Sequence, residues 1–395
     1  MPTAIVNGVR LNYVRMDNGE ADGREHLIMV HGLATSMAFW YFRYATEFAK
    51  QFRVTLYDLR GHGRSEMPPS GYAPGQLAQD LGALMDHLGM SSAHFLAHSF
   101  GGVVTLNLAV AAPQRVRSLV LADSHLSAVR HVETSQEWEY GQRLQPILDR
   151  HGIDLDTRDP YFGYKLLTRV AEWQMRGFAL PDEVAELVSP LLGKAGSRTS
   201  AQWLQLMRTT AAETEMMGDD GLTLDKLRAL RFPILAMYGD HSQARLTGAE
   251  LLALWPHAEF LRVRDAGHFF PTSRRRCVIA KPLRSNTMSI ARFSGSTSAT
   301  KCLMPRARAM RARCASSLPP SPWPWKSSSI VNETSAPAAG LPGSSIANDA
   351  PPMICSPPSG RGRQTTRRTS LSKSTSVHSR SVCSLGSPCA VKRRR

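Results

Sequence analysis

Short apolar runs that alternate with helical patterns constrain the fold of this 395-residue chain more than any other feature. Buried strands are predicted at His26–Val30, Phe52–Leu59, Ala93–Ala97, Val116–Ala122, Phe232–Tyr238 and Glu259–Val263. Leucines and other apolar residues at helical spacing predict helices at Gln76–Leu88, Phe100–Ala112 and Ala249–Trp255. Because strands alternate with helices, we expect an α/β fold with a mostly parallel sheet that helices cover on both faces.

Two further segments complete the expected organisation of the first 270 residues. The Asn7-Gly8 dipeptide between Thr3–Val6 and Val9–Tyr13 tolerates positive φ at both turn positions, which predicts a β-hairpin. The segment from Ser124 to about Leu230 has no strand pattern and is rich in Trp, Met, Leu, Glu and Arg, so it predicts several helices. Since it follows the sixth strand, we interpret it as a helical lid over the sheet. The expected domains are therefore core residues 1–123, lid 124–230, core 231–273 and tail 274–395.

The tail differs from the rest of the chain in composition. Residues 271–395 hold twenty-two Lys and Arg, two acids and all six cysteines, whereas the first 270 residues hold 26 basic and 30 acidic residues. One interpretation is a disordered basic arm that binds nucleic acid or anionic lipid. The other is out-of-frame translation after His268, because GC-rich codons read out of frame yield mainly Arg, Ser, Pro, Ala and Gly.

We favour the second interpretation, because the composition changes where a last helix should begin. Basic runs occur only at Arg274–Arg276 and Lys392–Arg395. The cysteines form no paired CxxC, so neither a disulfide framework nor a zinc site is expected. No apolar run approaches the roughly 20 residues of a membrane span, and the N-terminus lacks the pattern of a signal peptide. A cytoplasmic protein with no membrane span and no specific nucleic-acid partner is expected, and its oligomeric state stays open.

The sequence Ala97-His98-Ser99-Phe100-Gly101-Gly102 lies between a predicted strand and a predicted helix. A serine in a sharp strand-to-helix turn is exposed above the sheet edge, and the turn needs small residues two positions before and after it, here Ala97 and Gly101. The N–H of Phe100 would begin the helix and could stabilise developing negative charge. The pattern predicts Ser99 as a nucleophile, although a serine that merely starts a helix is the alternative.

Two other segments supply candidate partners for Ser99. His31-Gly32-Leu33 follows a strand, and its glycine allows a turn that would aim the Leu33 N–H at the oxyanion position. His268 follows the last strand in Asp265-Ala266-Gly267-His268-Phe269-Phe270. An imidazole with a pKa near 6.5 suits a general base at neutral pH, so His268 is the candidate base.

These motifs, together with Asp58-Leu59-Arg60-Gly61-His62-Gly63-Arg64-Ser65, resemble the α/β-hydrolase superfamily in its lidded, serine esterase-like branch, over residues 1 to about 271. The resemblance implies a serine hydrolase that cleaves a small-molecule carboxylic ester or related acyl substrate through an acyl-enzyme, without a metal or organic cofactor. A C–C bond or lactone hydrolase with the same residues is an alternative, as is a non-catalytic ligand-binding member. The Asp58–Ser65 loop is expected to be structural, with His62 exposed.

Within this superfamily the residue at the nucleophile position separates reaction classes. Haloalkane dehalogenases and epoxide hydrolases of the fold have Asp where this chain has Ser99. The C–C bond hydrolases that cleave ring-fission products resemble His-Gly followed by a glycine-rich stretch, whereas His31-Gly32 is followed here by residues 33–36, Leu-Ala-Thr-Ser. Both comparisons favour an esterase-like enzyme.

The acid that would orient His268 has two candidates. In the resembling lidded hydrolases it usually follows the seventh strand, but that position holds Ser242 in Tyr238-Gly239-Asp240-His241-Ser242. Asp240 is on the same loop two residues earlier, and Asp123 ends the sixth strand, where some relatives place their acid. Both remain candidates, because geometry rather than sequence position decides such cases.

The lid is rich in aromatic residues and methionine, namely Trp138, Trp173, Trp203, Met207, Met216 and Met217. Each could simply pack between lid helices, but together they favour a largely apolar substrate pocket. We expect Phe39, Trp40, Trp138 and Phe269 to border that pocket.

Overall fold

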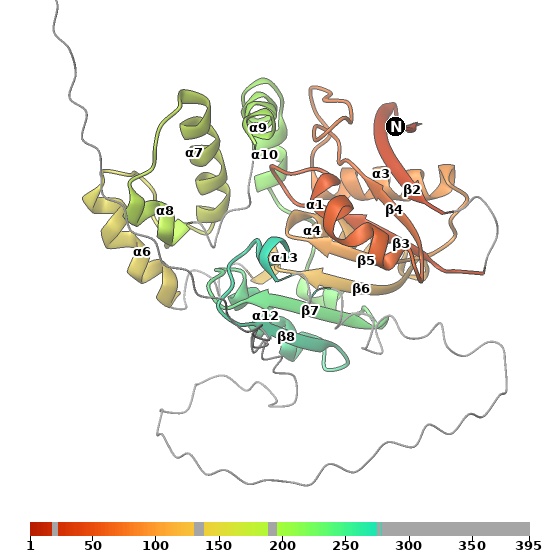
Figure 1. Cartoon of the computed structure of the whole chain (residues 1–395). Helices are drawn as coiled ribbons and strands as arrows, with labels where there is room; N and C mark the ends of the chain where they lie inside the picture. The colour runs from red at the N-terminus through yellow and green to blue at the C-terminus, as the bar shows by residue number, and fades with distance from the viewer. Residues whose placement is uncertain (18–22, 130–137, 189–195, 275–277, 279–395) are drawn as a thin grey trace, which may run out of the picture. The chain divides into compact units, whose positions relative to one another are not determined.

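A computed structural model describes residues 1–17, 23–129, 138–188, 196–274 and 278 (Figure 1). Apart from Arg274 and Val278, the predicted basic tail lies outside these residues, so both interpretations of it stay predictions. The domain boundaries proposed from composition likewise stay predictions.

The described strands form one eight-stranded, mostly parallel sheet with the order β1-β2-β4-β3-β5-β6-β7-β8. Their bounds are β1 Thr3–Val6, β2 Val9–Met16, β3 His26–Val30, β4 Arg53–Tyr57, β5 Ala93–His98, β6 Val116–Ala122, β7 Ile234–Gly239 and β8 Glu259–Val263. The turn between β1 and β2 uses Asn7 at φ 47° and Gly8 at φ 73°, which confirms the predicted hairpin. The mostly parallel α/β sheet expected from the sequence is also confirmed.

The strands bury both faces, and alternate residues belong to different cores. Ile28 and Val30 of β3 pack in one cluster, while Leu27 and Met29 pack in the other. The first cluster includes side chains of α3 (Pro74–His87), α4 (Phe100–Ala111) and α12 (Arg245–Leu254). The second includes the segment of α1 (Ala38–Trp40), the π-helical turn Tyr41–Ala45 and α2 (Thr46–Phe48), together with Phe270 of α13 (Phe270–Ser273). Helices therefore flank both faces of the sheet.

The segment between β6 and β7 folds into the helices α6 Glu139–Arg150, α7 Phe162–Arg176, α8 Asp182–Val188, α9 Ser197–Thr209, α10 Ala212–Met217 and α11 Leu224–Arg228. In Figure 1, α6, α7 and α8 lie apart from the sheet, and α9 and α10 lie nearer to it. Leu144, Phe162 and Val184 belong to a small core shared by α6–α8, whereas Trp203 of α9 and Met216 of α10 belong to the first of the two clusters on the sheet. The insertion thus has one part with its own core and one part that packs on the main body.

The strand register fixes which loops meet at the carboxyl edge of the sheet. His98, the last residue of β5, pairs with Ala122, the last residue of β6, and Ala122 pairs with Met237 of β7. The residues that follow these strands, Ser99 and Asp123, are therefore neighbours. This edge is where parallel α/β sheets bind ligands.

Candidate active site

Ser99 lies in a tight turn between β5 and α4, at φ 54° and ψ −126°. Positive φ is uncommon for a residue with a side chain, so the surroundings must hold it there. A Cβ on Gly101 would lie 2.5 Å from the carbonyl oxygen of His31, and one on Gly32 would lie 2.8 Å from the Cβ of Ser99. The turn can approach the end of β3 because Gly32 and Gly101 have no side chain. The Ser99 N–H donates to the Ala122 oxygen at 2.9 Å.

Ser99, His268 and Asp123 form a continuous hydrogen-bonded row. The Oγ of Ser99 lies 2.9 Å from Nε2 of His268, and Nδ1 of His268 lies 2.9 Å from Oδ1 of Asp123. With its proton on Nδ1, the imidazole donates to the carboxylate and accepts from the serine hydroxyl. Asp123 is fully buried, so its carboxylate is shielded from bulk solvent.

Asp240 does not lie in this row. Its carboxylate is ion-paired with the guanidinium of Arg262 on β8, and its backbone N–H donates to the Val263 oxygen at 3.1 Å. Of the two acids weighed from the sequence, the geometry therefore brings Asp123 to His268 and leaves Asp240, which follows β7, paired with the edge strand β8. The backbone of Asp240 continues the ladder to β8, and its side chain pairs with Arg262 of that strand rather than with His268.

His98 supports His268 from behind. Its Nε2 lies 3.0 Å from the backbone oxygen of His268, so with a proton on Nε2 it donates to that carbonyl. Burial lowers the pKa of His98 well below its ordinary value, and the nearby His268 lowers it further. A neutral His98 can pack against His268 without repelling the positive charge that the His268 imidazole would gain during a reaction. The sequence drew attention to His98 only as part of the serine motif.

Phe39 and Trp40 do not line the cavity next to Ser99, which corrects the expectation for both. Phe39 stacks on His98 with ring centroids 4.6 Å apart, and so lies behind the site. Trp40 is fully buried, and its Nε1–H donates to the Val30 oxygen at 3.0 Å. Trp40 belongs to the second core cluster and the half-buried Phe39 packs against that cluster, directions that the sequence pattern did not reveal.

A cavity of about 140 Å³ adjoins Ser99 and His268. Trp138 and Phe269 line it, together with Leu33 and Phe100, the residues proposed to donate N–H groups to an oxyanion. Of the other aromatic and Met residues expected in the lid, Met216 and Met217 reach the cavity, whereas Trp173, Trp203 and Met207 are not among its lining residues. Most of the remaining lining is apolar and comes from α4 and the start of α7, in particular Val103, Pro160, Tyr161, Phe162, Tyr164, Leu166 and Leu167. Polar lining residues from other loops are His125, Asp220, Ser242 and Gln243.

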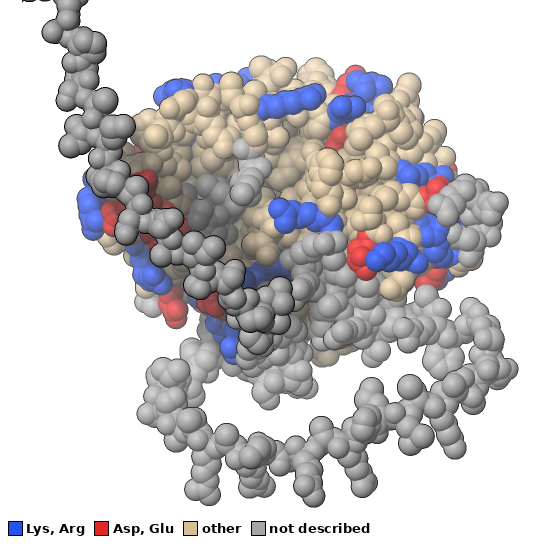
Figure 2. All heavy atoms as spheres, viewed as in Figure 1, with Lys and Arg blue, Asp and Glu red and all other residues tan. Residues whose placement is uncertain are grey.

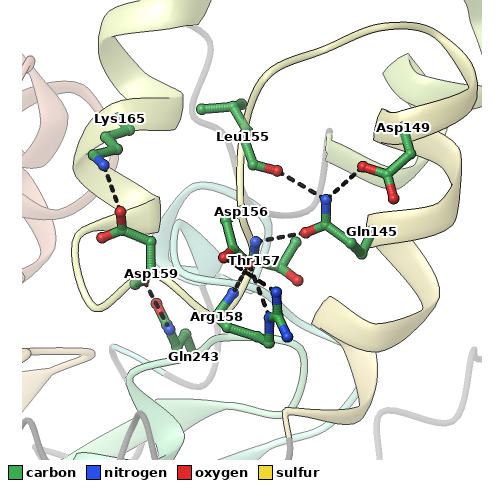
Figure 3. A network of polar contacts seen from close by, with 9 residues as sticks. All are labelled: Gln145, Asp149, Leu155, Asp156, Thr157, Arg158, Asp159, Lys165 and Gln243. Carbon is green, nitrogen blue, oxygen red and sulfur yellow. Dashed lines mark hydrogen bonds and ion pairs between the residues drawn. The ribbon is translucent and has the colours of Figure 1, made fainter.

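The α7 wall was missed from the sequence, because periodicity marks an apolar helix face without saying what that face covers. A polar network orders the loop that leads into α7 (Figure 3). Gln145 of α6 accepts from the N–H of Thr157 at 2.7 Å and donates to the Leu155 oxygen at 3.1 Å. Near the core, Asp159 is ion-paired with Lys165, and its backbone oxygen lies 3.5 Å from Nε2 of Gln243, in the loop after β7. This network ties the cavity wall to a loop that also approaches His268.

The Asp58–Ser65 loop is structural, but its histidine is not exposed. The Asp58 carboxylate accepts from Asn12 Nδ2 at 2.7 Å and from the backbone N–H groups of Met37 and Arg64 at 2.8 and 2.9 Å. His62 is buried, which corrects the expectation that it faces solvent. Burial lowers its pKa to about 4. Because the buried Asp58 carboxylate holds this loop through three hydrogen bonds, His62 in the middle of the loop lies inside the protein.

Charges on the described surface are of mixed sign. On the face shown in Figure 2, basic and acidic residues are interspersed and do not gather into one patch. Within the described ranges, no group of three or more His, Cys, Asp or Glu side chains could hold a metal ion. No helix in the part of the chain that the structure describes is long and apolar enough to cross a membrane.

Similarity to known proteins agrees with this geometry. A family model described as alpha/beta hydrolase fold matches residues 25–274. The chain is 36% identical over 118 residues to the dihydrolipoyllysine-residue acetyltransferase component of the acetoin cleaving system of Cupriavidus necator, which covers 30% of this chain and 30% of that protein. It is 34% identical over 142 residues to 3-oxoadipate enol-lactonase 2 of Acinetobacter baylyi, covering 36% of this chain and 50% of that protein. These matches thus span half or less of the relatives' own length.

Solved structures give the same fold. Carboxylesterase CesB from Bacillus subtilis superposes with a TM-score of 0.50 at 18% sequence identity, covering 71% of this chain and 89% of that chain. Naproxen esterase from the same species gives a TM-score of 0.50 at 17% identity, with the same coverage. At these identities the likeness is one of fold.

Proposed function

This chain belongs to the α/β-hydrolase fold family, and on that premise we propose that it is a serine hydrolase that cleaves a carboxylic ester or a related acyl substrate through an acyl-enzyme. The observation that carries the proposal is the row of Ser99, His268 and Asp123, with two contacts of 2.9 Å. Serine needs a base to become nucleophilic, and this row supplies one next to a cavity.

In the proposed reaction, His268 takes the proton of Ser99 as Oγ attacks the substrate carbonyl. The imidazolium that forms is stabilised by the buried carboxylate of Asp123. The N–H groups of Leu33 and Phe100 would bind the oxyanion. Phe100 opens α4, where the first N–H groups have no acceptor within the helix. His268 then gives its proton to the leaving alcohol, and a water that it activates releases the acid.

The cavity favours an apolar acyl or alcohol group of limited size. Its volume of about 140 Å³ is close to the roughly 150 Å³ of an engineered apolar cavity that binds benzene. One ring or a short alkyl chain would therefore fill it. The names of two relatives agree with acyl cleavage, an enol-lactonase and a putative carbamate hydrolase. We expect p-nitrophenyl butyrate to be hydrolysed at least tenfold faster, in kcat/KM, than p-nitrophenyl laurate.

Ser99→Ala tests the proposal. Its turnover of p-nitrophenyl butyrate should fall about 10⁴- to 10⁶-fold, because the remaining oxyanion donors catalyse only weakly. A fluorophosphonate probe should label the wild-type chain and not the variant, which gives a readout independent of substrate choice. If Ser99→Ala kept more than a tenth of the activity, the assignment would be wrong. A wild-type chain that labels but turns over no ester would point to the non-catalytic alternative.

A further inference from the structure

Ser242 occupies the loop between β7 and α12 and contacts the carboxylate that serves His268. Its side chain is buried, and its Oγ lies 2.5 Å from Oδ1 of Asp123. The N–H of Ala244 donates to the same Oγ at 3.2 Å. Because the hydroxyl oxygen already accepts there, its own proton is directed to Asp123, which as a carboxylate can only accept.

Three donors thus fix the Asp123 carboxylate. Oδ1 receives the hydroxyl of Ser242 and Nδ1 of His268, and Oδ2 receives the N–H of Gly239 at 2.8 Å. Two of these three donors come from the end of β7 and the loop after it, although the acid itself follows β6. The orientation of the acid therefore depends on a loop that supplies no carboxylate to the row.

We propose that Ser242 is a positioning residue that holds Asp123 in the orientation required by His268. The Ser242 Oγ and the His268 Nδ1 both contact Oδ1 of Asp123, so the hydroxyl of Ser242 fixes the oxygen that the imidazole uses. The inference rests on the proposed function, since it concerns the rate of that reaction.

Ser242→Ala removes one hydrogen bond to a buried charged group. Such bonds contribute enough to change a rate about 10- to 100-fold, so kcat for p-nitrophenyl butyrate should fall by that factor with KM within about twofold of the wild type. Ser242→Thr keeps the hydroxyl and should recover most of the loss. The matched control is Ser118→Ala, which removes a buried hydroxyl 2.7 Å from His94 at the other end of β6. It should lower thermal stability and leave kcat unchanged.

The outcomes separate this inference from the function on which it rests. A wild-type chain that neither hydrolyses the ester nor labels at Ser99 with the fluorophosphonate would refute the proposed function. A wild-type chain that does both, with Ser242→Ala within twofold of it in kcat, would refute the positioning role. A Ser242→Ala variant that loses activity in step with Ser118→Ala would also refute it, because the loss would then reflect stability.

Discussion

Replacing Asp123 by Asn should reveal how strictly the site depends on one carboxylate. The side chain is fully buried and accepts from Gly239 N–H, the Ser242 hydroxyl and His268 Nδ1. An amide has only one acceptor oxygen, and the N–H of Gly239 cannot turn away to accommodate an NH₂ group. The Asn oxygen must therefore face Gly239, which places the NH₂ against His268.

That arrangement forces the wrong form of the imidazole. To accept from the NH₂ group, Nδ1 of His268 must lose its proton, so the neutral ring carries it on Nε2 instead. Nε2 then cannot take the proton of Ser99. Loss of the correct tautomer in a serine triad costs about 10⁴ in turnover, and we expect a loss of that order here.

Asp240→Asn is the matched control, because it changes the other acid considered from the sequence. Asp240 is paired with Arg262, and their side chains are 13% and 51% exposed. Because this pair lies outside the hydrogen-bonded row of Ser99, His268 and Asp123, its loss should affect stability rather than the reaction, and the variant should keep at least a fifth of wild-type turnover. Initial rates with p-nitrophenyl butyrate over a range of concentrations would give kcat and KM for both. A crippled Asp240→Asn next to a near-normal Asp123→Asn would refute the reasoning.

Three further predictions test the surroundings of the site. His98→Phe keeps an aromatic ring against Phe39 but removes the donor to the His268 carbonyl, so kcat should fall about tenfold; an unchanged kcat would contradict the supporting role. Burial lowers the pKa of His62 to about 4, so between about pH 4 and 6.5 this histidine is protonated in the unfolded chain and neutral in the folded chain. The contribution of this group to the free energy of unfolding is therefore fully present above about pH 6.5 and falls by roughly 3 kcal/mol as pH falls toward 4. Urea melts should show a flatter pH dependence of stability in His62→Asn than in the wild type. Parallel pH dependences in the two proteins would refute the assignment. Gly101→Ala should lower Tm despite the better helix propensity of Ala, because the new Cβ would lie 2.5 Å from the His31 oxygen. Gly163→Ala is the control, since Gly163 is also the second residue of a helix but a Cβ there would have nothing within 4 Å, and this variant should raise Tm.

The strand and helix pattern, the hairpin and the serine turn could all be predicted from the sequence. Each depends on local order along the chain: β3 and β6 have the predicted bounds because a short apolar run between polar turns leaves few alternatives. The turn that carries Ser99 could be predicted for the same reason, since a small residue, a serine and a glycine at fixed spacing make one particular turn possible.

The partner of His268 and the cavity wall depended on tertiary structure. Asp123 and Asp240 each follow a strand that ends at the same sheet edge, and only the register and the turn after each strand decide which carboxylate faces the imidazole. The same limit explains Trp40, which lies in the core, Phe39, which packs against it, and the aromatic start of α7, which faces the cavity. A sequence specifies which residues are apolar or acidic at short range, but the direction of a side chain between distant segments is set by packing, and packing exists only once those segments meet.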